Sequence, residues 1–311
     1  MSRGLGILVA ASLISWGVPE GGLRGAPLAV EEVAAGVFVH VGETADFTPG
    51  NRGGIANLGF VVGEEAVAVI DTGGSAAQGR DWLETVRSIT DRPIRWVVVT
   101  HVHPDHMLGT AAFAGVGATV WGHAALPRAI AERGPSYLAR MADLLGPAVE
   151  GTSLPRIDET VVEGELRELD LGGRVLELRA WPTAHTDGDL TVFDRATGTL
   201  FAGDLLFVER LPVIDGSLPG WLAVLDRLAA LPARRVVPGH GPATAPWPAA
   251  LAAERAYLKE LRDAVRAVLR RGLSLARAVT AVPPPHPGNW RLIEPDHGRN
   301  VVAAYTELEW E

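Results

Sequence analysis

The chain of 311 residues contains no cysteine, and this absence excludes disulfides, thiolate metal ligands and a cysteine nucleophile. Lysine is almost missing as well, because Lys259 is the one lysine and every other basic residue is arginine. No basic run and no stripe of arginines and aromatics occurs, and the formal net charge at pH 7 is −9. A nucleic-acid partner is therefore not expected.

Turn-forming residues, in contrast, are abundant. The chain has 36 glycines and 22 prolines, which predict many turns and several functional loops. Hydrophobic residues make up 47% and charged residues 21%, a globular composition that excludes a disordered chain. The length is sufficient for a substantial core in one large domain or two.

Residues 1–29 have the pattern of a signal peptide or leader. Arg3 precedes an apolar stretch over residues 4–18, which has the length of a signal-peptide hydrophobic region and is too short for a comfortable membrane span. We therefore expect a periplasmic or secreted bacterial protein without a stable membrane span. A cytosolic leader on a cytoplasmic protein is the alternative, and the lack of cysteine does not separate the two.

The first half of the remaining chain alternates short strands and helices. Leu58–Val62 and Ala66–Ile70 have the pattern of a hairpin, and the second of these strands ends at Asp71. Ser75 is placed to cap a helix that extends through Thr90. The continuous apolar run Ile94–Thr100 then predicts a strand buried on both faces, and it ends at His101.

The second half repeats this order. A strand over Thr199–Gly203 ends at Asp204, a helix covers roughly Gly220–Leu231, and a short strand over Arg235–Val237 leads to His240. Two such halves, each of two strands and a helix, predict an α+β fold in the form of a four-layer αββα sandwich. Loops from both halves should meet along one edge of it.

The last part of the chain is predicted to be helical. Ala253–Arg271 carries apolar residues at helical spacing and stops at Gly272. A last short helix is expected within Asn300–Glu311. These elements predict a C-terminal helical extension over residues 251–311, packed on the preceding domain.

The segment from His101 to His106 concentrates three imidazoles and a carboxylate directly after the buried strand. Side chains two residues apart point the same way in an extended segment, so His101 and His103 can share one metal ion. Asp105 and His106 can then turn toward a second ion, because Pro104 prevents a helix from beginning earlier. Imidazole and carboxylate together suit borderline metals such as Zn²⁺.

The pattern His-x-His-x-Asp-His resembles the signature of the metallo-β-lactamase superfamily, and the rest of that family's ligand set follows in order. The resemblance covers residues 30–250, which we interpret as the catalytic domain. It implies one metal held by His101, His103 and His185, and a second held by Asp105, His106 and His240. It further implies that Asp204 bridges the two metals and that Asp71 orients the metal ligands without binding the metals itself. The other histidines, His40, His123, His286 and His297, fit no ligand position.

The family resemblance implies a hydrolase of the glyoxalase II and β-lactamase type, acting on a small molecule. Two zinc ions per chain would share a bridging hydroxide, which attacks an ester, thioester or amide. Asp105 or Asp204 would accept the proton during breakdown of the intermediate. Iron is possible in place of zinc, because histidine and aspartate accept both.

Further motifs resemble the quinoprotein relay system zinc metallohydrolases, which are exported proteins linked to quinoprotein alcohol oxidation. These motifs are Gly54–Asn57, Ala184–Leu190, Phe201–Phe207, Arg210–Ser217, Gly220–Trp221 and Arg299–Val301. The implied partner is a quinoprotein dehydrogenase. Two alternatives stay open: a mononuclear iron enzyme similar to the persulfide dioxygenases, and a non-enzymatic carrier that binds a quinone.

Two loops are expected to line the cleft. Thr48–Asn57 is rich in glycine and is interpreted as a mobile flap over the metals. Phe207–Pro219 carries Arg210, for which we keep two hypotheses: a contact with an anionic group of the substrate, or a surface salt bridge.

Overall fold

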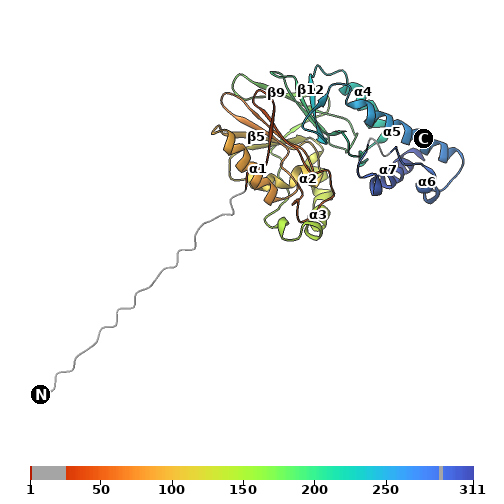
Figure 1. The fold of residues 1–311 in the computed structure, drawn as a ribbon, viewed down its shortest axis with the longest axis horizontal. Coiled ribbons are helices and arrows are strands. Elements are labelled where there is room, and N and C mark those ends of the chain that lie inside the picture. Colours follow the sequence, from red (N-terminus) through yellow and green to blue (C-terminus); the bar gives the residue numbers. More distant parts are fainter. Residues whose placement is uncertain (2–25, 287–289) are drawn as a thin grey trace.

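The computed structural model describes residue 1 and residues 26–286 and 290–311, and it contains two β-sheets that pack against each other with helices on their outer faces (Figure 1). The first sheet has seven strands in the order β1 to β7, and the second has six in the order β13-β12-β11-β10-β9-β8. The leader expected over residues 1–29 lies almost wholly outside the described residues. Among the helices that the structure describes, none has both the length and the apolar character needed to cross a membrane.

The first half of the chain forms the first sheet and the helices outside it. Its strands are β1 (Glu31–Ala34), β2 (Val37–His40), β3 (Leu58–Val62), β4 (Val67–Ile70), β5 (Ile94–Val98), β6 (Thr119–His123) and β7 (Glu159–Val161). Its helices are α1 (Ala76–Ile89), α2 (Pro104–Met107) and α3 (Leu126–Leu145), with 3-10 turns η1 (Leu108–Phe113) and η2 (Gly146–Val149).

The second half forms the second sheet and the C-terminal helices. Its strands are β8 (Leu166–Asp170), β9 (Val175–Ala180), β10 (Leu190–Asp194), β11 (Thr199–Phe207), β12 (Arg235–His240) and β13 (Ala245–Pro246). Its helices are α4 (Leu218–Leu228), α5 (Leu251–Arg270), α6 (Leu275–Ala281) and α7 (Ile293–Leu308).

Three apolar cores separate four layers, as the αββα prediction requires. One core lies between the first sheet and α1 and α3, and includes Trp82 and Met141. A second lies between the two sheets and includes Val61 and Leu178. The third joins the second sheet to α4, α5 and α7, and includes Trp221. The predicted fold is therefore confirmed.

The repeated unit of the two halves is a parallel strand–helix–strand crossover: β4–α1–β5 in the first sheet, where β6 and β7 add two more parallel pairs, and β11–α4–β12 in the second. Parallel strands bring their carboxyl ends to the same edge, so Asp71 and His101 come together after β4 and β5. The side chain of Ser75 accepts a hydrogen bond from the Gln78 amide and caps α1 as predicted. The internal repeat read from the sequence thus corresponds to two parallel crossovers.

Several boundaries differ from the sequence-based expectation. Strand β11 does not end at Asp204 but continues to Phe207, because it pairs with β12 as far as His240. The structure adds helix α3, whose sequence is interrupted by Pro135. The tail helix α7 starts at Ile293 rather than near Asn300. Pro104 occupies the first turn of α2, where its missing N–H costs no hydrogen bond.

Candidate metal centre

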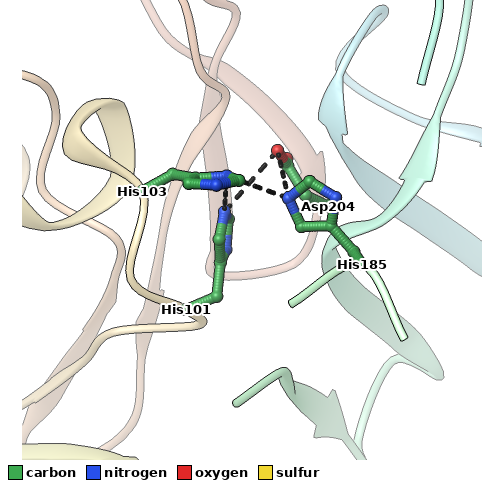
Figure 2. A group of neighbouring side chains, drawn as sticks. All are labelled: His101, His103, His185 and Asp204. Atoms are coloured by element: carbon green, nitrogen blue, oxygen red, sulfur yellow. Dashed lines mark hydrogen bonds and ion pairs between the residues drawn. The ribbon is translucent and has the colours of Figure 1, made fainter. Parts of the chain in front are cut away.

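Four side chains from three separate segments converge on one point between the sheets (Figure 2). His101 and His103 follow β5, His185 follows β9, and Asp204 lies in β11. The Nδ1 atom of His103 lies 3.2 Å from His101 Nε2 and 2.9 Å from His185 Nε2. The Oδ2 atom of Asp204 lies 3.6 Å and 3.4 Å from the same two Nε2 atoms. Three imidazole nitrogens and a carboxylate oxygen therefore face one shared position.

A second group lies beside the first and consists of Asp105, His106 and His240, all buried. The Nε2 atom of His240 lies 3.3 Å from Asp105 Oδ2, and His106 Nε2 lies 3.1 Å from Asp204 Oδ1. Asp204 Oδ2 is also 3.5 Å from His240 Nε2. Asp204 thus faces both groups, one carboxylate oxygen toward His106 and the other toward the first group.

The donor atoms fit a pair of divalent cations. His106 Nε2 and Asp204 Oδ1 are buried, and neither makes a hydrogen bond among the described residues although they are close together. Orphaned buried polar atoms are costly, and a cation between them would remove that cost. Imidazole nitrogens with carboxylate oxygens are a donor set that suits zinc and neighbouring metals. The seven residues predicted as ligands are therefore brought together in two groups that could each hold an ion.

Hydrogen bonds behind the histidines fix which ring nitrogen faces the centre. Nδ1 of His185 lies 2.7 Å from the Val213 carbonyl oxygen, and Nδ1 of His240 lies 2.8 Å from that of Ile55. A carbonyl oxygen can only accept, so each Nδ1 carries the hydrogen and each Nε2 presents its lone pair to the centre.

Asp71 lies where a carboxylate that orients a metal ligand is expected, beside His106. Its Oδ2 lies 2.8 Å from His106 Nδ1, while Thr100 donates its amide to Oδ1 and its hydroxyl to Oδ2, both at 2.8 Å. Its backbone has φ 58°, in the left-handed region that a non-glycine residue seldom adopts. Such strain is often kept at functional sites, and here it aims the carboxylate at His106.

His103 is oriented by a residue that the sequence analysis did not single out. His103 turns Nδ1 to the centre, and its Nε2 lies 3.1 Å from Asp215 Oδ2. Arg133 of α3 donates to the same oxygen at 2.8 Å. The only signal in the sequence was the place of Asp215 in the loop after β11.

Charges within the centre support one another. Burial would raise the pKa of Asp204, but His106, His240 and His101 hold it well below its usual range. Burial lowers the pKa of His106, and Asp204, Asp71 and Asp105 outweigh this and raise it well above the ordinary value. Burial lowers the pKa of His101 well below the ordinary value, and the neighbouring His106 lowers it further. The centre therefore keeps its carboxylates ionised and attracts positive charge.

The end of strand β12 approaches the centre so closely that only glycine fits there. A Cβ atom on Gly239 would lie 1.9 Å from Asp204 Oδ1. The amide of Asn57 donates to the Gly239 carbonyl at 2.8 Å, and its side chain donates to the Pro238 carbonyl at 2.9 Å. The expectation of a mobile flap is therefore wrong for residues 53–57, which are buried and hold the end of β12 that carries His240.

A cavity of about 240 Å³ opens over the two groups. Its walls combine Phe47, Ile55, Tyr137, Met141, Val213 and Phe207 with Arg140, Arg210 and Arg299. Arg210 is only 8% exposed, and no described carboxylate forms an ion pair with it, so the surface salt bridge considered for it is wrong. A larger cavity of about 510 Å³ beside β2 contains no histidine and is remote from this chemistry.

The chain resembles several curated proteins over part of its length. It is 30% identical over 178 residues to a hydroxyacylglutathione hydrolase of Acidiphilium cryptum, a match that covers 56% of this chain and 60% of that protein. A shorter match, 47% identical over 49 residues, is to a linear primary-alkylsulfatase of a Pseudomonas species and covers 16% of this chain and 9% of that protein. The chain therefore matches less than two thirds of the length of these relatives.

Solved structures share the fold at low sequence identity. A metallo-β-lactamase from Pontibacter korlensis is similar with a TM-score of 0.59 and 23% identity, over 75% of this chain and 99% of that one. A sec-alkylsulfatase from a Pseudomonas species is similar with a TM-score of 0.66 and 16% identity, over 90% of this chain and 50% of that one. The family model of the metallo-β-lactamase superfamily matches residues 51–240, which include all seven residues of the two groups. With the fold, the paired groups and this match in agreement, the chain belongs to the metallo-β-lactamase superfamily.

Proposed function

We propose that the chain is a hydrolase that binds two zinc ions and acts on a small molecule in the cavity above them. The observation that carries this proposal is the position of Asp204, whose two oxygens face two separate groups of buried ligands. A single-metal protein has no need for the second group. The relatives named hydroxyacylglutathione hydrolase support a hydrolytic reaction on a thioester or ester.

The roles follow from the geometry. Metal ions at such sites act as Lewis acids and lower the pKa of water into the neutral range. His101, His103 and His185 would hold one ion, and Asp105, His106 and His240 the other, with Asp204 between them.

Asp105 is the side chain that we assign to proton transfer. It lines the cavity, and its Oδ2 is turned toward His240, which leaves Oδ1 to accept a proton from the reacting group. Burial would raise the pKa of Asp105, but His106 and His240 lower it far enough to keep the carboxylate ionised. The carboxylate is therefore in the form that accepts a proton, and its lowered pKa makes it a weaker base than an ordinary aspartate.

The finer assignment rests on the motifs that resemble quinoprotein relay system zinc metallohydrolases. We propose that the protein is exported to the periplasm and is linked to a quinoprotein dehydrogenase. The catalytic domain would then cover residues 30–250, followed by the helical extension over 251–311. Asn57 lies within one of these motifs, and its contacts to the end of β12 support a role in holding the centre.

The test combines metal analysis of the purified protein with turnover of a panel of esters, thioesters, alkyl sulfates and β-lactams. About two zinc ions per chain are expected, and His103→Ala should lose metal and activity together. His40→Ala is the matched control, because His40 lies in β2 outside both groups.

Two results would overturn the proposal. One iron per chain with oxygen uptake would show the dioxygenase. Tight quinone binding without turnover of any ester would show the carrier.

A further inference from the structure

The C-terminal helices bind the chain between the end of β11 and the start of α4, residues 207–218, which we call the connecting segment. Its backbone amides donate three hydrogen bonds to side chains of these helices, one at each end and one in the middle. The acceptors are Glu254 of α5 and Asn300 and Glu307 of α7, at 3.0, 2.9 and 2.8 Å. The C-terminal extension therefore determines where the connecting segment lies.

The connecting segment in turn orients two histidines of the first ligand group. The Val213 carbonyl accepts from His185 Nδ1 at 2.7 Å, and Asp215 Oδ2 lies 3.1 Å from His103 Nε2. The Asp215 amide also donates to the His185 carbonyl at 3.0 Å. A displacement of the connecting segment would therefore turn ligand rings, although the segment itself contains none of the seven candidate ligands.

Asn300 and His185 bind opposite sides of one peptide group. Asn300 Oδ1 accepts from the Ile214 amide at 2.9 Å, and this N–H belongs to the same planar unit as the Val213 carbonyl. That carbonyl accepts from His185. Hydrogen bonds in such a chain polarise and strengthen one another. Asn300 Nδ2 fixes the preceding residue as well, because it donates to the Pro212 carbonyl at 2.6 Å.

The Asn300 amide is held in a single orientation. Its side chain is fully buried, and its second N–H donates to the Tyr257 hydroxyl oxygen at 2.9 Å. The Tyr257 hydrogen is directed to His297 Nδ1, at 3.2 Å, because His297 Nε2 donates to the Val282 carbonyl at 3.4 Å. A flipped Asn300 would set its NH2 group against a peptide N–H, and its oxygen against a carbonyl.

We propose that Asn300 is a positioning residue of the metal centre, which holds the peptide group between Val213 and Ile214 so that His185 keeps Nε2 directed at the first ion. This inference rests on the metal binding in the proposed function. Asn300 lies outside residues 51–240, which the family model matches, so the C-terminal extension is part of the metal centre rather than an addition to it. Loss of such an outer contact typically lowers metal affinity by about 10- to 100-fold.

The first test follows the Nδ1–H protons of His185 and His240 by nuclear magnetic resonance in the full-length, zinc-loaded protein. Each proton is donated to a backbone carbonyl, but Asn300 stands behind only the carbonyl that binds His185. In Asn300→Ala we expect the His185 signal to move upfield and to exchange with solvent about 10-fold faster. The His240 signal should stay unchanged, which makes it an internal reference.

Glu307→Ala is the matched control. Glu307 also belongs to α7 and binds the same connecting segment, through the Ser217 hydroxyl at 2.6 Å and the Leu218 amide at 2.8 Å. Among the described residues it makes no hydrogen bond to the peptide group beside Val213. Its replacement should lower stability and leave the His185 signal in place. An equal change of that signal in Glu307→Ala and Asn300→Ala would overturn the inference.

Asn300→Asp covers the case in which Asn300→Ala fails to fold. It keeps an acceptor for the Ile214 amide, and a charged acceptor makes the stronger hydrogen bond. The His185 signal should therefore move downfield, opposite to its change in Asn300→Ala. An unchanged His185 signal in Asn300→Asp would overturn the inference.

Zinc affinity separates the inference from the proposed function. Competition with a chromophoric chelator should show one of two ions bound about 10- to 100-fold more weakly in Asn300→Ala than in the wild type. This loss without hydrolysis of any ester would refute the hydrolase and keep the role of Asn300. Hydrolysis by the wild type, with equal zinc affinities in the wild type and Asn300→Ala, would do the reverse.

Discussion

The two halves of the molecule contribute to the metal centre in different ways. The first half supplies four of the seven candidate ligands from one short segment, His101 to His106, directly after β5. The second half supplies His185, Asp204 and His240 from three separate strands or strand ends. One half therefore presents a compact local motif, whereas the other depends on the sheet to bring distant residues together.

The supporting contacts show the same difference. Behind His106 of the first half stands a network of residues from that half, in which Asp71 joins Thr100 and His106. The contacts of the second half span more of the sequence: Asn57 binds the end of β12 that carries His240, and Asn300 of α7 accepts from the Ile214 amide and donates to the Pro212 carbonyl. We infer that the second half is the more vulnerable to remote substitutions.

Replacement of the shared carboxylate should have the largest effect on both halves. Asp204→Ala removes a ligand that faces both groups, so we expect both metals to be lost and activity to fall by about 1,000-fold or more. His103→Ala removes a ligand of one group, and the second metal should be partly retained. Metal analysis after dialysis against a weak chelator measures this, and equal metal loss in both variants would contradict the asymmetry.

A methyl group on Gly239 of β12 tests the close approach in the second half. The Cβ atom of Gly239→Ala would overlap Asp204 Oδ1, so the carboxylate must move, and a shift of about 1 Å in an active site can cost 100-fold in rate. Gly115→Ala is the control, since a Cβ there meets no atom within 4 Å. Turnover and metal content are compared for the two variants, and equal values would show that the approach is not critical.

What could be predicted from the sequence follows the same division. The αββα fold and the cluster from His101 to His106 were readable because strand patterns and a local motif lie along the chain. His185, Asp204 and His240 were placed through a family resemblance, since a single histidine or aspartate at a strand end has no local signature. Asp215 was missed as a partner of His103, because the two are 112 residues apart and only the folded sheet joins them.

Neutralisation of Asp215 tests whether the second half also orients a ligand of the first. Asp215→Asn weakens the acceptor at His103 Nε2, and loss of such an outer partner typically lowers metal affinity by about 10- to 100-fold. Asp187→Asn is the matched control, because Asp187 also pairs with Arg133, at 3.3 Å, but makes no hydrogen bond to His103 among the described residues. Zinc affinity by competition with a chromophoric chelator measures the effect. Equal affinities in the two variants would show that Asp215 does not position His103.

The smallest expected effect is on the pH dependence of stability, and it concerns Glu254, a buried acid that contacts the end of β11. Glu254 of α5 is fully buried, its Oε1 accepts from the Phe207 amide at 3.0 Å, and its Oε2 has no hydrogen-bond partner among the described residues. Burial raises the pKa of Glu254 well above its ordinary value. Because the folded pKa exceeds the unfolded one, the stabilisation is complete below the unfolded pKa and is lost as pH rises through the folded pKa.

Glu254→Gln keeps an acceptor for Phe207 and removes the titration. Its Tm should fall less than that of the wild type as pH is raised from mildly acidic to alkaline, by about 2–4 °C for each kcal/mol of ionisation cost removed. Glu260→Gln, at an exposed position of the same helix, should follow the wild type. Parallel Tm curves for all three proteins would show that the pKa of Glu254 is the same in the folded and the unfolded state. The support of Phe207, and with it the end of β11, would then be independent of pH.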